Sequence, residues 1–145
     1  MPLAIFVWDV GYGISVPKKY QTTKGSISEA LKGFQKKEGT NGVEIYKLKG
    51  WDYAGMCEIL EPAIQKIRDT HTPAIFHVEE ITQPQGHSTS GSHERYKPTE
   101  RLEWEREWDG IKKMKEWIIS ADLATDEELN DLQDEAKNEV RKGKN

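Results

Sequence analysis

Three short apolar stretches along the chain predict β-strands. Residues 3–10 (LAIFVWDV) are almost continuously large or β-branched, which is typical of a strand buried on both faces of a parallel sheet. Residues 43–50 (VEIYKLKG) place apolar residues between polar ones, and residues 73–81 (PAIFHVEEI) are again mostly apolar. Their length and their content of β-branched and aromatic residues favour strands over helices.

Helical periodicity appears between these strands. Residues 26–34 (SISEALKGF) can start at a capping serine, Ser26 or Ser28, and they carry apolar residues with helical spacing: Ile27, Leu31 and Phe34. Residues 53–71 carry a longer apolar stripe: Met56, Ile59, Leu60, Ile64 and Ile67. Pro62 interrupts this stripe, so we expect it to kink the helix or to restart it at a first-turn position.

The alternation of strands and helices predicts an α/β fold, in which a parallel sheet of about three strands is connected by right-handed crossovers with flanking helices. After a polar loop the pattern becomes entirely helical. Residues 98–119 carry three tryptophans, with Gly110 indicating a break, and residues 125–140 open with a capping box, Thr125 to Glu128. We therefore divide the chain into an α/β part at 1–80, a loop at 81–99 and a helical extension at 100–145.

Composition narrows the class of protein. The net charge of −4 argues against a nucleic-acid partner, and no apolar run approaches the ~20 residues that a membrane-spanning helix needs. The single cysteine, Cys57, rules out an internal disulfide and fits a reducing compartment, so we expect a cytoplasmic protein without a membrane partner. Cys57 lies within the helical pattern, where we expect it to be a small buried residue.

Chemistry is expected at the carboxyl ends of the strands, where open α/β sheets bind ligands. Gly11 and Gly13 follow the first strand and allow close approach of the backbone, although two glycines are also an ordinary turn. The loop at 81–99 is long and polar, as binding loops often are. His87 follows Gly86 and has a side chain suited to proton transfer, but an isolated loop histidine more often faces solvent. Phosphate-loop and zinc-protease motifs are absent from the sequence.

In the segment GHSTSGSHERYK (residues 86–97), a Gly-His-Ser-x-Ser loop precedes a pair of tyrosine and basic residues. This motif resembles the alpha subunit of the thiamine-diphosphate-dependent decarboxylating component of 2-oxoacid dehydrogenase complexes. The resemblance extends in the same order over nearly the whole chain, through FVWDVGYGIS (6–15), QTTKGSISEALKGF (21–34), VEIYKLKGWDY (43–53) and WDGIKKMKEWIISADLATDEELNDLQDEA (108–136). The His-Ser-Thr-Ser form of the loop favours branched-chain 2-oxoacids over pyruvate.

The resemblance implies roles for particular residues. His87 matches the catalytic loop histidine. Ser88 matches the serine that is phosphorylated in some relatives to switch the loop, and we also expect it to be a cofactor-binding residue. Tyr12 matches the residue whose backbone carbonyl holds Mg²⁺, while Ile14 packs against the pyrimidine side of thiamine diphosphate and Ser15 offers a polar contact. The implied cofactors are thiamine diphosphate and Mg²⁺. The implied partners are a beta subunit, or a beta region of the same enzyme, and a lipoyl-bearing acyltransferase.

The sequence also departs from the family pattern. The metal site needs a side-chain oxygen two residues before Tyr12, where this chain has Val10, and a Gly-Asp-Gly motif that precedes the first strand in relatives. The Tyr-Arg pair reads Arg95-Tyr96, followed by Lys97 where the arginine would stand. We therefore expect a fragment of the dehydrogenase that is inactive alone and does not hold the cofactor. Because a three-stranded sheet has edge strands with unpaired backbone groups, we also expect the isolated chain to form a homo-oligomer. The alternative is a non-catalytic subunit-interaction module that docks through its tryptophan-rich helices.

Overall fold

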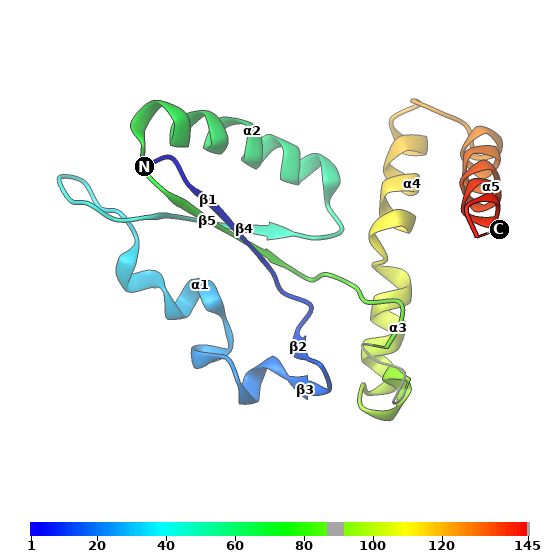
Figure 1. Ribbon diagram of the computed structural model, residues 1–145, viewed down its shortest axis with the longest axis horizontal. Coiled ribbons are helices and arrows are strands. Elements are labelled where there is room, and N and C mark those ends of the chain that lie inside the picture. The colour runs from blue at the N-terminus through cyan, green and yellow to red at the C-terminus, as the bar shows by residue number, and fades with distance from the viewer. Residues whose placement is uncertain (87–91, 145) are drawn as a thin grey trace.

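The computed structural model describes residues 1–86 and 92–144. Its main sheet has three parallel strands in the order β1 (Ala4–Trp8), β5 (Ala74–Glu79) and β4 (Glu44–Lys49), so the last strand in sequence is the central one (Figure 1). The strands are in simple register, with Phe6 opposite Phe76 and Phe76 opposite Tyr46. The predicted α/β class and the three-stranded parallel sheet are confirmed.

The central strand is the apolar core of the fold. Residues 74–78 of β5 are all buried, because strands cover both edges of β5 and helices cover both faces. The edge strand β1 has an equally apolar sequence, yet most of it is exposed. Its large apolar residues are accessible to solvent: Leu3, which precedes the strand, and Ile5, Phe6 and Trp8 within it. A parallel strand with exposed apolar side chains and a free edge is typical of a sheet that continues in another segment or subunit.

Helix α2 (Tyr53–Thr70) covers one face of the sheet. Asp52 caps its first turn by accepting a hydrogen bond from Gly55 N, and Ala63 and Ile67 pack into the core beside Phe76. Pro62 lies inside one uninterrupted helix, so the expected restart does not occur. Cys57 is exposed, and the expectation that it is buried was wrong, because the core-facing stripe of α2 passes through Met56 and Leu60 and leaves Cys57 outside.

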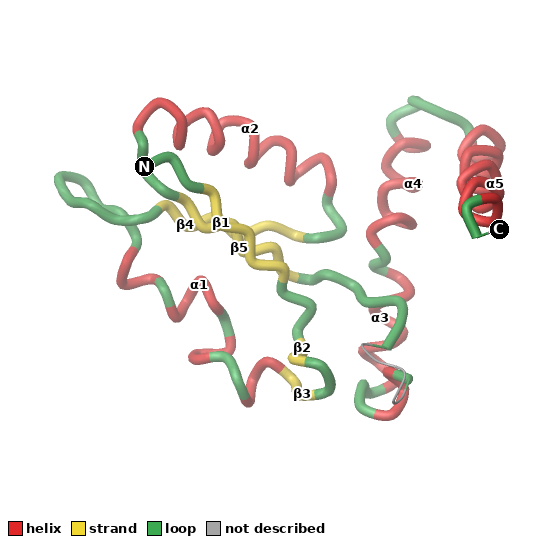
Figure 2. Tube along the Cα trace, in the orientation of Figure 1, coloured by secondary structure: helices red, strands yellow, loops and turns green. Residues whose placement is uncertain are grey.

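The opposite face carries short elements (Figure 2). After the small hairpin of β2 (Tyr12–Gly13) and β3 (Val16–Pro17), the chain forms the 3-10 turns η1 (Lys18–Tyr20) and η2 (Thr23–Gly25) and then α1 (Ile27–Ala30). The helix expected over residues 26–34 is therefore a single turn, followed by the 3-10 turn η3 (Lys32–Phe34). Phe34 is 67% exposed, because the change to 3-10 geometry at Leu31 takes it off the face that Ile27 shares.

The helical extension begins after the 3-10 turn η4 (His93–Arg95) with α3 (Thr99–Glu107), α4 (Gly110–Ser120) and α5 (Asp126–Lys142). Asp109 caps α4 through Ile111 N and Lys112 N, which confirms the break predicted at Gly110. The capping box at the start of α5 is also present, since the Thr125 side chain accepts from Glu128 N and the Glu128 side chain accepts from Thr125 N.

The interaction-module alternative supposed that the tryptophans of the extension form one exposed patch. They do not gather in this way. The Trp108 ring packs 4.4 Å from that of Trp51, in the loop after β4, and the Trp117 ring lies 5.9 Å from that of Tyr53 at the start of α2. These contacts attach α3 and α4 to the carboxyl end of β4. Helix α5 is almost wholly exposed. Among the described residues no helix has the length and apolar character to cross a bilayer.

Candidate functional site

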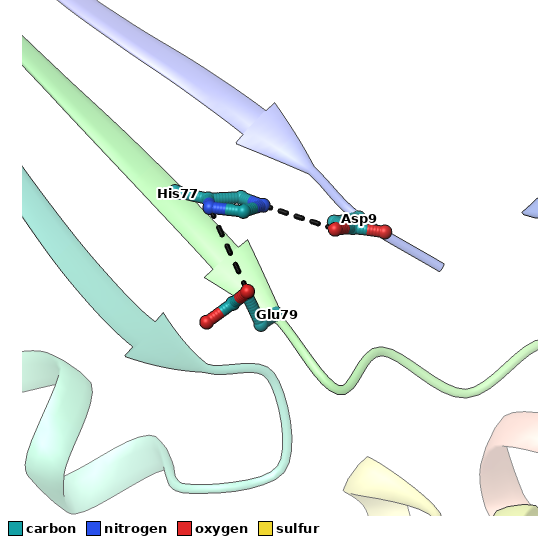
Figure 3. Close-up of side chains that lie close together, drawn as sticks. All are labelled: Asp9, His77 and Glu79. Atoms are coloured by element: carbon teal, nitrogen blue, oxygen red, sulfur yellow. Dashed lines mark hydrogen bonds and ion pairs between the residues drawn. The ribbon is translucent and has the colours of Figure 1, made fainter. Parts of the chain in front are cut away.

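A buried histidine joins two strand ends on the α1 side of the sheet. His77, in β5, has no solvent-exposed surface; its Nε2 lies 3.0 Å from Oδ2 of Asp9, the residue that follows β1 (Figure 3). Its Nδ1 lies 2.9 Å from the buried Ser28 Oγ of α1. An ionised carboxylate can only accept, so Nε2–H donates to Asp9, and in a neutral ring Nδ1 then accepts from the Ser28 hydroxyl. His77 thereby connects α1, β5 and the loop after β1.

Asp9 is held in its ionised form. Burial of its carboxyl raises the pKa, but hydrogen bonds from Lys18 Nζ (2.8 Å), Gly11 N (2.8 Å) and His77 outweigh burial and bring the pKa below its ordinary value. A lowered pKa in the folded state means that the ionised form is favoured by folding. The Asp9 contribution to stability is therefore present above the unfolded pKa and is lost as the pH falls through the folded one.

Glu79 completes a cluster that has the composition of a metal site. Single ligand atoms of Asp9, His77 and Glu79 all lie within 4.8 Å of one another. The two carboxylates, however, approach different ring nitrogens, Asp9 at Nε2 and Glu79 at Nδ1 (3.8 Å). The Lys18 ammonium lies 2.8 Å from Asp9 and 3.9 Å from Glu79. The cluster is therefore an ionic network with a lysine as its cation, and a metal would have to displace Lys18.

A cavity of about 170 Å³ opens beside this cluster at the carboxyl ends of β1 and β5. Its lining residues come from both strand ends and from α3: Asp9, Val10, Gly11, Lys18, Glu79, Glu80 and Arg101. The lining carries three carboxylates and two cations, and two of the carboxylates, Glu79 and Glu80, also form ion pairs with Lys47 and Lys49 of β4.

The predicted cofactor residues lie in the loop above the cavity. The Tyr12 ring is 5.9 Å from the Tyr96 ring, with Lys97 Nζ 5.5 Å away over its face. Ile14 and Ser15 form the two-residue turn of the β2–β3 hairpin and are exposed, and Ile14 adopts a left-handed φ of 60°. Tyr12 is thus in contact with the chain after the polar loop, whereas Ile14 and Ser15 stand at the tip of the hairpin. His87 and Ser88 lie outside the described residues.

A buried charge network connects α3 to the loops at the carboxyl ends of the strands. Lys97 Nζ, 1% exposed, donates to both oxygens of Glu105 at 2.8 Å, and Arg101 Nε donates to Glu105 Oε1 at 2.8 Å. Lys97 stands where the resemblance expects an arginine, and here its ammonium is paired with Glu105 and buried.

The Mg²⁺ ligands implied by the resemblance are not assembled by the described residues. Val10 has no side-chain oxygen, and its carbonyl accepts a hydrogen bond from Arg101 Nη2 at 3.1 Å. Asp9, the neighbouring carboxylate, already accepts from three donors. Mg²⁺ needs near-octahedral oxygen ligands, so the Tyr12 carbonyl with this surrounding does not make a site by itself.

Sequence reasoning missed the His77 network, although one signal pointed to it. In β5, His77 and Glu79 occupy alternate positions on either side of Val78, and a charged or polar residue inside a buried strand requires a partner. The partners themselves could not be found this way, since Ser28 and Asp9 are 49 and 68 residues away in sequence.

The fold and the site define a parallel α/β domain whose polar groups and loops converge at the carboxyl ends of its strands. The sequence model of the dehydrogenase E1 component family matches residues 2–143, and the chain belongs to this family. The family is one of thiamine-diphosphate-dependent oxidoreductases. A curated relative is the pyruvate dehydrogenase E1 component subunit alpha of Porphyra purpurea, 28% identical over 111 residues.

That alignment covers 76% of this chain and 31% of the relative, so the chain spans about a third of the length of the curated relative it matches. No solved structure matches the chain.

Proposed function

We propose that this chain is the part of a 2-oxoacid dehydrogenase decarboxylating component that carries the loops on one side of its thiamine diphosphate site. The observation that carries the proposal is the meeting of the Tyr12 loop, the start of the 81–99 loop and α3 at the carboxyl ends of the strands, around the cavity that Arg101 lines. The resemblance assigns the first two of these segments to the cofactor. The enzyme decarboxylates a 2-oxoacid and transfers the acyl group to lipoyl.

The residue roles in this proposal follow the resemblance. The Tyr12 carbonyl, with Ile14 and Ser15, belongs to the cofactor loop, and Ser88 and the catalytic His87 belong to the loop after β5. Support comes from the position of Tyr12 beside α3 at the strand ends. The His-Ser-Thr-Ser motif supports a branched-chain 2-oxoacid as substrate, while the curated relative is a pyruvate dehydrogenase subunit.

We further propose that the partners are a beta subunit or beta region and a lipoyl-bearing acyltransferase. The exposed apolar edge of β1 supports a requirement for additional sheet, and Leu132 and Val140 leave apolar surface on α5. The same exposed surfaces support self-association of the isolated chain. A non-catalytic interaction module would use these surfaces too, but it gives no reason for the charged groups gathered at the strand ends.

The isolated chain is expected to bind no thiamine diphosphate. The missing side-chain oxygen at Val10 leaves the metal that accompanies the diphosphate with too few ligands. Isothermal titration of the 145-residue chain with thiamine diphosphate and Mg²⁺ should show no heat of binding. Titration of the longer enzyme that contains the chain is the control, and micromolar affinity for the isolated chain would contradict the incomplete-site interpretation.

In the longer enzyme, His87→Ala is expected to slow acyl transfer to lipoyl by about 10²-fold, the lower range for loss of a general acid–base residue. Thermal unfolding should change little, because His87 belongs to a stretch of the sequence that contains no large apolar residue. The measurements are lipoyl acylation and the melting temperature, with His71→Ala at the C-cap of α2 as the matched control. Acylation at the parental rate would exclude the role assigned to His87.

A further inference from the structure

Arg101, in the first turn of α3, is bonded to both strand-end loops. Its Nη2 donates to the backbone carbonyl of Val10, just after β1, at 3.1 Å and to that of Ile81, just after β5, at 3.4 Å. The side chain is 24% exposed and borders the cavity. One guanidinium therefore connects two loops that are 71 residues apart in sequence (10 and 81), and it does so at the edge where the site lies.

The orientation of this guanidinium is fixed from the other side. Arg101 Nε donates to Glu105 Oε1 one turn further along α3, and Glu105 is itself held by Lys97 through both oxygens. The Trp104 ring lies 4.5 Å from the guanidinium carbon and supports its face. A planar group bonded along one edge and stacked on one face has little rotational freedom, so Arg101 holds its two carbonyls at a defined separation.

Arg101 holds the loop after β1 from outside, in addition to the bonds within the loop from Gly11 N to Asp9 Oδ1 and from Lys18 N to the Gly11 carbonyl. Gly11 has a left-handed φ of 80°, and a Cβ built there would lie 3.8 Å from Arg101 Nη2, so the backbone passes close to the guanidinium. Asp9 holds Gly11 N from one side, and Arg101 holds the Val10 carbonyl from the other. Tyr12, whose ring is 5.9 Å from the Arg101 guanidinium carbon, follows directly.

We propose that Arg101 is a positioning residue that sets the conformation of residues 10–12 relative to Ile81, with Glu105 and Lys97 fixing its orientation. Lys97, which stands where the resemblance expects an arginine, is buried against Glu105 and orients Arg101 through it. The structural part of this proposal is independent of the proposed function. Its consequence for catalysis rests on that function, because it requires the Tyr12 loop to take part in the site.

The test replaces the planar guanidinium of Arg101 with an ammonium group, which keeps the positive charge. In the 145-residue chain, Arg101→Lys is expected to speed amide hydrogen exchange at Gly11 and Lys18 by about tenfold, the effect of losing one charged hydrogen bond. These amides bond to Asp9 Oδ1 and to the Gly11 carbonyl, and both bonds lie within the loop. Arg106→Lys, on the exposed side of the same helix, is the matched control and should leave exchange unchanged.

The possible outcomes of this test lead to different conclusions. Faster exchange confined to residues 10–18 supports the positioning role. Unchanged exchange there, or equal acceleration at Phe76 in β5, overturns it, since the second result means general destabilisation. In the longer enzyme, Arg101→Lys should lower kcat/KM for the 2-oxoacid by about tenfold. If exchange changes locally while kcat/KM stays parental, the positioning stands and the function proposed for this edge fails.

Discussion

Replacing Phe76 with alanine is expected to lower the free energy of unfolding by about 3 to 5 kcal/mol. The Phe76 ring is fully buried at the centre of the sheet and stacks between Phe6 on β1 (centroids 4.8 Å apart) and Tyr46 on β4 (5.2 Å). The helix above it contributes Ala63 and Ile67 to the same cluster. Removing the ring leaves a cavity bounded by three strands and a helix, which cannot collapse easily. Urea unfolding followed by fluorescence measures the loss.

The matched control is Phe6→Ala in the same cross-strand register. Phe6 is 37% exposed on the edge strand, so its removal takes less apolar surface from the interior and should cost clearly less stability. Equal losses for the two variants would mean that β1 is covered in solution. In that case, the exposed edge described above would be buried in a self-associated form of the chain.

Replacing Glu105 with glutamine is expected to lower the free energy of unfolding by about 3 to 5 kcal/mol, because the buried positive charge of Lys97 and Arg101 loses its anion. Lys97 would keep an ammonium that is 1% exposed, and Arg101 would lose its charged partner. The loss is measured by the same urea unfolding. It should appear without any change in side-chain size, which separates it from a packing effect.

Glu103→Gln is the control for this charge effect. Glu103 lies two residues away on α3 and is exposed, so the change should stay within about 0.5 kcal/mol. A second variant that combines Glu105→Gln with Lys97→Met removes the stranded ammonium and should recover part of the lost stability. A loss below about 1 kcal/mol for Glu105→Gln alone would show that water or another anion reaches Lys97.

Local features of the fold could be read from the chain because their causes are local. The three strands, the stripe on α2, the break at Gly110 and the capping box at Thr125 each depend on residues within a few positions of one another. Expectations that depended on the full course of an element were less secure. The helix over residues 26–34 is one turn plus a 3-10 turn, and Cys57 lies on the exposed side of α2.

The site also has features that depend on local sequence and features that depend on distant residues. The loop containing Tyr12 was expected at the end of the first strand, and the structure places it there beside a cavity. The charges that shape the cavity could not be assigned from the sequence, because Arg101, Glu79 and Asp9 come from three separate segments. Lys97 illustrates the difference most clearly. Its type and position suggest a ligand contact, whereas its surroundings make it the buried partner of Glu105.

By itself, the sequence determined which segments become strands and helices, and the motifs that relate the chain to its family, because periodicity and capping act over short distances. Tertiary structure alone decided that β5 lies at the centre, that His77 links Ser28 to Asp9, and that Arg101 holds the loops after β1 and β5 together. The physical reason is that strand order and buried charge pairing depend on which distant groups are excluded from water together.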